Sequence, residues 1–512
     1  MKFLGMQRLA GVMLAAMIAG APIAAPALAQ EAPAPAAAAP AAAMDPAAEA
    51  APAEAPAEAV AAPAEEPAAA PTPDKGDTTW MLVSTILVLL MILPGLALFY
   101  GGLVRQKNML SMLMQVSIVT VIGMMAWAFW GYSLAFTDGG GLNKFVGGAS
   151  KLFLNGALYN ADGGFTNVET FSRDVVIPEI VFVCFQMTFA CITAALVLGG
   201  LAERMKFAAV VLFAILWPLL SYYPMAHMVW WWAGASSAFG QTADALSGGA
   251  GQIWAFGALD FAGGTVVHIN AGIAALVGAL VLGPRKGHRT EPMPPHSLTL
   301  TLVGAGLLWV GWFGFNAGSN LEANGYAGLA MVNTLLATAA AGFSWAMTEW
   351  VTRKKASMLG LASGLVAGLV AVTPAAGFAG PVGAIVLGLI VSPVCVFFCS
   401  VIKNALKYDD SLDAFGIHAI GGIIGAIGTG ILVNPALGGA GVVDFTNGAV
   451  GYDAVFQITA QIKGVLLTIA WSGIASAIVF LLIKFTIGVR ASADAEEEGL
   501  DIVEHGERAY HT

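Results

Sequence analysis

The sequence predicts an all-α integral membrane protein with eleven transmembrane helices, and three observations lead to this fold class. First, 58% of the 512 residues are hydrophobic and only 11% are charged, so the chain is far more apolar than an ordinary soluble protein. Second, eleven apolar runs have about 20 residues or more, the length needed to cross a ~30 Å hydrocarbon core. Third, basic residues are concentrated in every other connection between these runs.

The eleven runs define the spans that we expect. The fifth and the tenth each carry a histidine, which suggests two five-span halves of opposite orientation, an inverted repeat with a shared site near the bilayer midplane. The last run has about 34 residues, too many to cross upright, so we expect a steeply tilted helix. The runs cover residues 79–103, 109–136, 178–200, 206–232, 262–283, 297–318, 325–350, 357–375, 379–402, 415–433 and 456–489.

The connections between the spans differ sharply in charge. One set holds only Lys144, Lys151 and Arg173. Because basic connections stay in the cytoplasm, we expect the mature N-terminus outside the inner membrane and the C-terminus in the cytoplasm. The cytoplasmic set holds Arg105, Lys107, Arg204, Lys206, Arg285, Lys286, Arg289, Arg353, Lys354, Lys355, Lys403, Lys407 and Arg490.

The two ends of the chain differ in composition from the spans. Residues 1–29 have two basic residues, a short apolar core and an Ala-x-Ala sequence, which is typical of a signal peptide; a genuine first span is the alternative. Residues 30–77 are almost wholly Ala, Pro and Glu, so we expect a disordered extracytoplasmic arm. Residues 491–512 form an acidic cytoplasmic tail, too short to fold alone. The membrane domain is therefore 78–490, whose net charge of +2 offers no basic face for nucleic acid.

Two histidines stand out because ionisable side chains within a membrane are expensive and usually functional. His268 lies in the sequence from Asp260 to Asn270, and His418 opens a second glycine-rich segment just after Asp413. If both lie at similar depth, they meet at the interface of the two halves. A structural imidazole with satisfied hydrogen bonds is the alternative for each. The glycines from Gly421 to Gly430 predict close helix contacts beside this pair.

Aromatic side chains occur near span ends that are predicted to face outside, at Phe189, Trp230 and Phe315. Ser319 places a hydroxyl group in the same region of the sequence as Phe315. Aromatic faces attract cations and a serine oxygen accepts hydrogen bonds from N–H donors. Each aromatic taken alone is more simply an anchor at the membrane interface. The charged Glu203, Glu349 and Lys463 near membrane boundaries indicate local ion pairs or snorkelling, and His227 is open to either interpretation.

Taken together, these segments resemble the Amt/Mep/Rh ammonium transporters, and within them the bacterial Amt branch. The resemblance extends from about Asp77 almost to the last residue. Single glycine-rich segments are not specific, but the combination is. Its parts are Asp77–Trp80, Pro94–Asn108, Asp260–Asn270, Gly311–Ser319, Asp413–His418, Glu498–Asp501, His505–Glu507 and Tyr510.

The resemblance implies a homotrimer whose subunits each have one narrow pore. It implies an outer ammonium-recruiting site of Phe189, Trp230 and Ser319, and a gate in which Phe189 stacks on Phe315. It also implies a pore lined by His268, His418 and Trp312, with Asp260 acting near the outer site through helix capping and electrostatics. The tail is similar to the segment that docks PII-type nitrogen-signalling proteins. One departure is the loop between Trp230 and Asp260, which is longer than the compact family pattern.

Three functions are compatible with this sequence. A transporter that recruits ammonium, removes its proton and passes ammonia is favoured, because a bare ion in a dry pore would pay a large desolvation cost. A sensor on the same fold would normally carry an added signalling domain, and a pore for another small neutral molecule would not need Trp230 with Ser319. No Ser-His-Asp pattern, phosphate loop or metal-ligand spacing predicts an enzyme or a cofactor. We expect buried thiols, without disulfide or metal, at Cys184, Cys191, Cys395 and Cys399.

Overall fold

The computed structural model describes residues 70–510, and the compact unit that holds the helices begins at Pro71. Eleven helices in this part of the chain are long and apolar enough to cross a membrane, as the sequence predicts. Each lies on one predicted span, with ends that differ by at most four residues. The predicted signal peptide and nearly all of the predicted arm lie outside the described residues.

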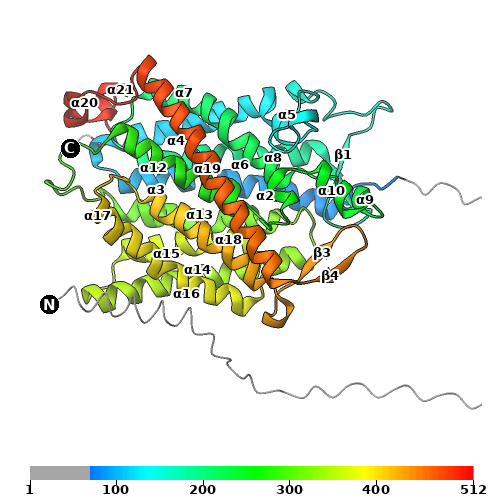
Figure 1. Cartoon of the computed structure of the whole chain (residues 1–512). Helices are drawn as coiled ribbons and strands as arrows, with labels where there is room; N and C mark the ends of the chain where they lie inside the picture. The colour runs from blue at the N-terminus through cyan, green and yellow to red at the C-terminus, as the bar shows by residue number, and fades with distance from the viewer. Residues whose placement is uncertain (1–69, 511–512) are drawn as a thin grey trace, which may run out of the picture. The chain divides into compact units, whose positions relative to one another are not determined.

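The first five spans form one half of the helical bundle (Figure 1). The first begins at Lys75, inside the range predicted for the arm, because the Asp74 carboxylate caps it by accepting from the N–H groups of Gly76 and Asp77. Several spans contain short segments of 3-10 or π-helix, labelled η. The bounds are Lys75–Leu90 (α2), Met91–Leu96 (η1) and Ala97–Leu103 (α3); Gln106–Asn108 (η2), Met109–Ala126 (α4), Trp127–Gly131 (η3) and Tyr132–Ala135 (α5); Glu179–Leu201 (α6); Phe207–Trp217 (α7), Pro218–Tyr222 (η6) and Tyr223–Trp230 (α8); Gly264–Ile269 (η7) and Asn270–Leu282 (α12).

The next six spans complete the bundle. The last of them, α19, has 33 residues and runs obliquely across the others in Figure 1, as its length predicts. The bounds are Leu298–Gly318 (α13); Gly325–Arg353 (α14); Met358–Val372 (α15) and Thr373–Ala375 (η8); Pro381–Phe397 (α16), Phe398–Ile402 (η9) and Lys403–Leu406 (α17); Phe415–Ala419 (η10) and Ile420–Leu432 (α18); Ala454–Thr486 (α19).

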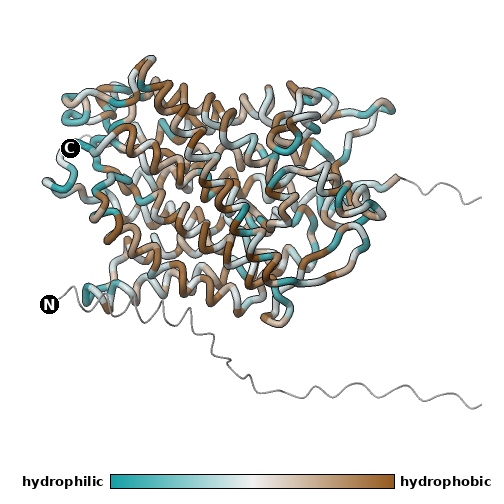
Figure 2. Tube along the Cα trace, viewed as in Figure 1, coloured by the Kyte–Doolittle hydropathy of each residue, from teal (hydrophilic) through white to brown (hydrophobic). Residues whose placement is uncertain are grey.

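The connections gather at two ends of the helices, which we name by their contents. The strand face comprises residues 136–178, 231–263, 319–324, 376–380 and 433–453, and the tail face comprises residues 104–105, 202–206, 283–297, 354–357, 407–414 and 487–510. Hydrophobic residues fill the middle of the helices, whereas hydrophilic residues gather toward both faces (Figure 2). All thirteen basic residues of the predicted cytoplasmic set lie on the tail face or at the helix ends beside it. The two faces therefore differ in charge as the sequence predicts.

The long loops of the strand face are folded. β1 (Asn167–Glu169) pairs antiparallel with β2 (Val176–Pro178), and β3 (Val442–Asp444) pairs with β4 (Ala449–Gly451). The unusually long loop after Trp230 forms three short helices, α9 (Ala235–Ala238), α10 (Ala243–Gly249) and α11 (Gln252–Ala255). The carboxylate of Glu169 accepts hydrogen bonds from the N–H groups of Ser236 and Ser237 at 2.8 and 3.0 Å. This contact fixes the loop to the β1–β2 hairpin.

Short 3-10 turns cover Gly140–Leu142 (η4), Leu152–Leu154 (η5) and Pro435–Leu437 (η11).

Glycine allows spans to approach closely at the centre of the bundle, both between the two halves and within the second half. A Cβ atom at Gly272 would lie 2.3 Å from the backbone nitrogen of Ala419, and one at Gly425 would lie 2.2 Å from the carbonyl oxygen of Ala371. Neither contact could accommodate a side chain. The glycine stripe predicted in the tenth span therefore packs its backbone against neighbouring helices. Because α12 carries on from η7, and α18 from η10, this packing also sets the separation of the two predicted pore histidines.

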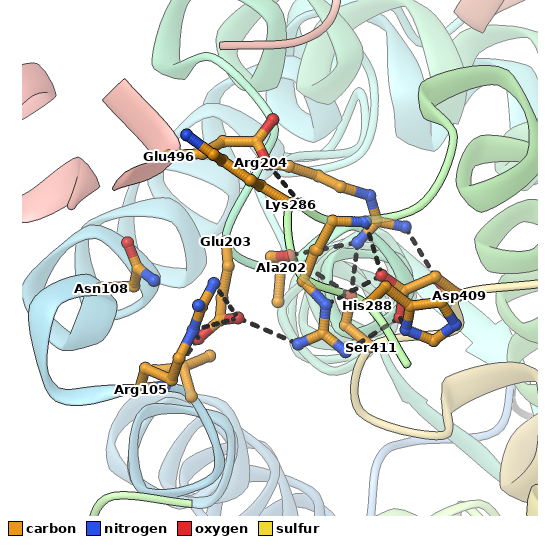
Figure 3. Close-up of polar contacts among 12 residues, drawn as sticks. Arg105, Asn108, Ala202, Glu203, Arg204, Lys286, His288, Asp409, Ser411 and Glu496 are labelled. Carbon is orange, nitrogen blue, oxygen red and sulfur yellow. Dashed lines mark hydrogen bonds and ion pairs between the residues drawn. The ribbon is translucent and has the colours of Figure 1, made fainter. Parts of the chain in front are cut away.

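A network of buried charges joins four connections of the tail face (Figure 3). Glu203 pairs with Arg105 at 3.0 Å and with Arg285 at 2.9 Å, and Asp409 pairs with Arg285 at 2.8 Å. Burial alone would raise the pKa of Asp409, but hydrogen bonds and charge from Arg285 outweigh it and hold that pKa well below its usual range. The same balance lowers the pKa of Glu203. The sequence-based expectation of a local ion pair at Glu203 is confirmed.

The acidic tail folds back on this face as α20 (Ala493–Glu498) and α21 (Leu500–His505). Asp501 accepts hydrogen bonds from the N–H groups of Leu110 and Ser111 at 3.1 and 2.8 Å, at the start of α4. Arg490 pairs with Glu496 at 2.5 Å. A carboxylate at a helix N-terminus is favourable because it meets the positive end of the helix dipole and unpaired N–H groups. The tail is thus ordered by the membrane domain.

Candidate functional site

Two cavities lie on one path through the bundle. A vestibule of about 670 Å³ opens at the strand face, and a cavity of about 10 Å³ lies deeper. The deeper cavity has about the space for one water-sized molecule, and we call it the lumen. Ser319 and Trp230 line the vestibule, whereas Phe315, one turn before Ser319 on α13, lines the lumen. The lumen is otherwise lined by Met91, Leu96, Phe99, Ile192, Leu196, Val267, His268, Leu308, Trp312, Val366 and His418.

Two stacked phenylalanine rings lie beside the lumen, next to residues that line the vestibule. The rings of Phe189 and Phe315 are 4.2 Å apart at an interplanar angle of 18°, and both side chains are fully buried. The indole of Trp230 meets Phe189 edge-on, with centroids 5.9 Å apart. The hydroxyl of Ser319 donates to the carbonyl oxygen of Phe315 at 2.8 Å, which leaves lone pairs of its oxygen free to accept. The four residues predicted for the outer site and gate thus lie together.

Asp260 organises the start of the fifth span. Its carboxylate accepts from the N–H groups of Gly263, Gly264 and Thr265 at 2.9, 2.6 and 2.8 Å, and also from the Thr265 hydroxyl. Gly263 has φ +117°, a conformation that side-chain-bearing residues rarely adopt, so the turn before η7 favours glycine. The carbonyl of Asp260 accepts from the Trp230 indole N–H at 3.0 Å. Asp260 therefore fixes both the helix that carries His268 and the ring of Trp230.

Asp410 has the equivalent place before the tenth span. Its carboxylate accepts from the N–H groups of Ala414, Phe415 and Gly416 at 3.0, 2.8 and 3.3 Å. It precedes His418 by eight residues, the same spacing that separates Asp260 from His268. Asp413, the aspartate that the sequence places just before His418, does not take this position. Asp413 has φ +60° in the turn, and its carboxylate pairs with Lys403 at 2.7 Å. Equal spacing from the histidine was the signal that identifies Asp410.

The two histidines meet inside the lumen. Their Nδ1 atoms are 3.3 Å apart, and their rings are 5.3 Å apart at an angle of 20°. One imidazole donates and the other accepts, so the pair shares one N–H···N hydrogen bond. The Nε2 atom of His268 is buried and has no hydrogen-bond partner among the described residues. That atom is available to a molecule that enters the lumen.

Trp312 completes the wall beside the histidines. Its ring stacks on that of His268 with centroids 5.4 Å apart at 23°, and its indole N–H donates to the Thr373 hydroxyl at 2.9 Å. The hydrogen bond satisfies the single polar atom of the indole, which leaves an apolar face toward the lumen. The structure therefore brings all the predicted pore residues to one cavity.

Comparison with known proteins gives the origin of this arrangement. The profile of the Ammonium Transporter Family matches residues 79–510. The chain belongs to the ammonium transporter family. A protein of Aquifex aeolicus described as "Ammonium transporter" is 43% identical over 440 residues, which are 86% of this chain and 94% of that protein.

Solved structures of this family have the same fold. Saccharomyces cerevisiae Mep2 matches with a TM-score of 0.70 and 32% identity, over 82% of this chain and 88% of Mep2. A "Sensor Amt Protein" matches with a TM-score of 0.71 and 27% identity, over 84% of this chain and 98% of that chain. The predicted family and the helical fold are confirmed, and the similarity to transporters agrees with the prediction that the chain is not an enzyme.

Other residues that the sequence singled out have local roles in this ammonium transporter family member. The ring nitrogens of His227 lie 3.0 Å from the Ala135 carbonyl and 2.7 Å from that of Asn143, so this histidine holds the loop after the second span. Glu349 pairs with Arg353 one turn later. The ammonium group of Lys463 lies 5.9 Å from the centre of the Phe256 ring.

The vestibule has an acidic lining that the sequence did not predict. Five carboxylates and one lysine line it. Glu179 is buried and pairs with Lys151 while it accepts from the Tyr132 hydroxyl, and Glu322 accepts from the N–H and hydroxyl of Ser172. These contacts join residues that are 28 to 150 positions apart in the sequence, so no local sequence pattern predicts them. Within residues 70–510, no cluster of His, Cys, Asp or Glu could hold a metal ion, and all four cysteines are free thiols.

Proposed function

We propose that the protein recruits ammonium at the vestibule, removes one proton and passes neutral ammonia through the lumen. Phe189, Trp230 and Ser319 form the recruiting site, Phe189 and Phe315 form the gate, and the paired His268 and His418 handle the proton. The observation that carries this proposal is the lumen itself, a nearly closed cavity of about 10 Å³ whose polar atoms come from two hydrogen-bonded imidazoles.

The size and polarity of the lumen favour ammonia over the ion. A cavity of this size holds one small molecule without a hydration shell, and a bare cation there would pay several kcal/mol or more of desolvation. Ammonia pays no such charge penalty and can hydrogen-bond to the unpaired Nε2 of His268. The vestibule meets the opposite requirement, because its five carboxylates attract cations and Trp230 offers an aromatic ring. The ion therefore gives up its proton to the histidine pair as it enters the lumen.

The gate must open for each molecule. Phe189 and Phe315 are in stacking contact and fully buried, so nothing passes while both rings keep these positions. Rotation of a buried aromatic side chain opens a path without moving its helix. The rings exclude water from the lumen in the closed position, which keeps the local dielectric constant low and the ion disfavoured there.

The orientation and assembly that we propose follow from the charge distribution and the resemblance. The basic tail face lies in the cytoplasm and the strand face outside the inner membrane, since basic connections resist translocation. Three copies assemble as a homotrimer with one pore each. Native mass spectrometry of the protein in detergent measures this: a dominant species of three subunits is expected, and a monomer alone contradicts it.

A PII-type signalling protein binding the tail face would close the pore from the cytoplasmic side. Support comes from α20 and α21, which dock beside the start of α4 and leave Val503 and Tyr510 exposed. Purified PII protein, tested across its effector-ligand states, is expected to bind the detergent-solubilised transporter in at least one state. Failure to bind in every state contradicts this partner.

The function is tested by uptake into proteoliposomes. Labelled methylammonium uptake, with current recorded in parallel, is expected to exceed that of empty liposomes and to be inhibited competitively by ammonium. The ratio of charge to substrate then distinguishes net ion transport from passage of ammonia alone. Ammonium binding without any uptake would instead favour a sensor, the class named by one of the similar structures.

A further inference from the structure

The amide side chain of Gln186 is buried on the vestibule side of the gate. α6 carries Phe189 and α13 carries Phe315, and these rings stack with centroids 4.2 Å apart. Gln186 precedes Phe189 by three residues on α6, and Ser319 follows Phe315 by four residues on α13. Because the two helices run in opposite directions, Gln186 and Ser319 both lie one turn from the gate toward the strand face. Both side chains line the vestibule.

The amide of Gln186 is buried without a matching partner. The residue is 7% exposed, and its Oε1 atom has no hydrogen-bond partner among the described residues. Nearly all buried polar atoms in native proteins are hydrogen-bonded, so an unpaired one needs an explanation. The side chain lines the vestibule, and a half-turn of its terminal amide exchanges the positions of the oxygen and the nitrogen. An acceptor kept unpaired at that position is suited to a ligand with N–H donors.

Most of the neighbouring carboxylate oxygens already accept hydrogen bonds from the protein itself. Asp260 accepts three backbone N–H groups and a hydroxyl at the start of η7. Glu179 is paired with Lys151 and Tyr132, and Glu322 accepts from Ser172 and Asn324. These carboxylates supply negative charge, and most of their oxygens already accept hydrogen bonds, although Glu179 makes both of its contacts through Oε1. The Ser319 oxygen and Gln186 Oε1, each one turn from the gate, are two acceptors that have capacity left.

We propose that Gln186 is a further ligand of the outer ammonium site, with Oε1 accepting an N–H from the ion while Ser319 and Trp230 hold its other sides. This inference rests on the proposed function, and it adds a residue to the recruiting site. The amide oxygen replaces one water ligand as the ion leaves the vestibule. Because an amide is neutral, it compensates for lost hydration without the strong ion pair that a carboxylate would form, so the ion can still give up its proton and move on.

Substitution of Gln186 by methionine tests the proposal, because methionine keeps the length of the side chain and removes the acceptor. Loss of a hydrogen bond to a charged group predicts that the concentration of labelled methylammonium giving half-maximal uptake rises about tenfold or more. The maximal rate at saturation is expected to change less than about twofold, since the gate and histidines are intact. Gln186→Glu is expected to lower the half-maximal concentration and the maximal rate together, because the ion is held too tightly.

Gln115→Met is the matched control. Gln115 is a buried glutamine on α4 whose Oε1 also has no partner among the described residues, but it lines neither cavity. The Gln115→Met variant is expected to keep wild-type uptake. Ser319→Ala serves as the positive control for the outer site and is expected to raise the half-maximal concentration.

The outcomes separate this inference from the proposed function. Absence of uptake by the wild-type protein overturns the function. If wild type and Ser319→Ala behave as expected while Gln186→Met and Gln186→Glu both keep the wild-type half-maximal concentration, the function stands and the role of Gln186 is overturned. Should Gln186→Met fail to fold, Gln186→Glu decides alone, because an unchanged half-maximal concentration in that variant contradicts the proposal.

Discussion

At the scale of single residues, each of the two histidines owes its position to an aspartate eight residues earlier. Asp260 and Asp410 each hold three successive backbone N–H groups at the start of a membrane span, on opposite faces of the protein. A carboxylate at a helix N-terminus accepts hydrogen bonds from backbone N–H groups that have no partner within the helix. Its negative charge also interacts favourably with the positive end of the helix dipole. The imidazoles of His268 and His418 are thereby presented to each other from two helices that enter the bundle from opposite sides.

The histidine pair gives the first prediction. Replacing either imidazole by alanine removes the shared hydrogen bond, at a cost of about 1–3 kcal/mol for the partner left unsatisfied, which the folded protein should survive. If the pair handles the proton, His268→Ala should abolish or greatly slow ammonium transport, or admit an unselective current that includes potassium once water enters the widened lumen. Uptake and current are compared with wild type at equal amounts of assembled protein. Unaltered rate and unaltered selectivity in both His268→Ala and His418→Ala would exclude a proton-handling role.

The second prediction concerns the cap of the tenth span. Asp410→Ala removes the acceptor for three N–H groups, so we expect a loss of about 0.5–2 kcal/mol of stability, the range measured for helix N-caps. The loss appears as a lower thermal unfolding temperature in detergent. Asp413→Ala is the control, because Asp413 forms one partly exposed ion pair with Lys403. Equal unfolding temperatures for the two variants would show that Asp410 contributes nothing specific as a cap.

At the scale of elements, the connections of the tail face act as one unit. Arg105, Glu203, Arg285 and Asp409 come from four connections, and their ion pairs lie within 3.0 Å. His288 lies 3.3 Å from the same Asp409 carboxylate, and Arg204 donates to the Asp409 carbonyl oxygen at 2.7 Å (Figure 3). Removing one member of such a buried network leaves an uncompensated charge, which is more damaging than the loss of an exposed pair.

This network predicts a pH dependence. The folded protein holds the pKa of Asp409 below its value of about 3.9 in unfolded chains. A depressed carboxyl pKa contributes stability that is fully present above the unfolded value and is lost as the pH falls toward the folded value. Asp409→Asn should therefore be less stable than wild type by a constant margin from about pH 5 to pH 7. The difference in thermal unfolding temperature in detergent should shrink below about pH 4. A difference that grows on acidification would contradict this assignment.

At the scale of the whole molecule, the membrane domain begins earlier than composition indicates. Asp74 caps α2, and the Asp77 carboxylate accepts from the N–H of Ala323 at 2.7 Å on the loop after the sixth span. The end of the Pro-rich region thus contributes to the strand face. The remainder of the predicted arm has no apolar face in its sequence.

The last prediction follows from that boundary. Deleting residues 30–70 from the mature protein should leave assembly and methylammonium uptake intact, because a segment of Ala, Pro and Glu cannot form a packed helix. A deletion that extends through residue 77 removes the α2 cap and the Ala323 contact, so it should lower the unfolding temperature. Native mass spectrometry and uptake are the measurements. Loss of assembly or uptake in the shorter deletion would show that the arm is structural.

The sequence by itself determined the number of spans, their bounds within a few residues, the concentration of basic residues at one face and the two histidines of the candidate pore, whereas the other candidate residues came from the resemblance to a family. These features depend on local hydropathy, charge and motifs, which are read along the chain. The tertiary structure alone decided which side chains meet. His268 and His418 are 150 residues apart in sequence, and Phe189 contacts Phe315 only because the fold brings these two rings of α6 and α13 together. Asp410 replaced Asp413 as the counterpart of Asp260 for the same reason: the direction of a side chain depends on the backbone conformation of its turn, and Asp413 has φ +60°.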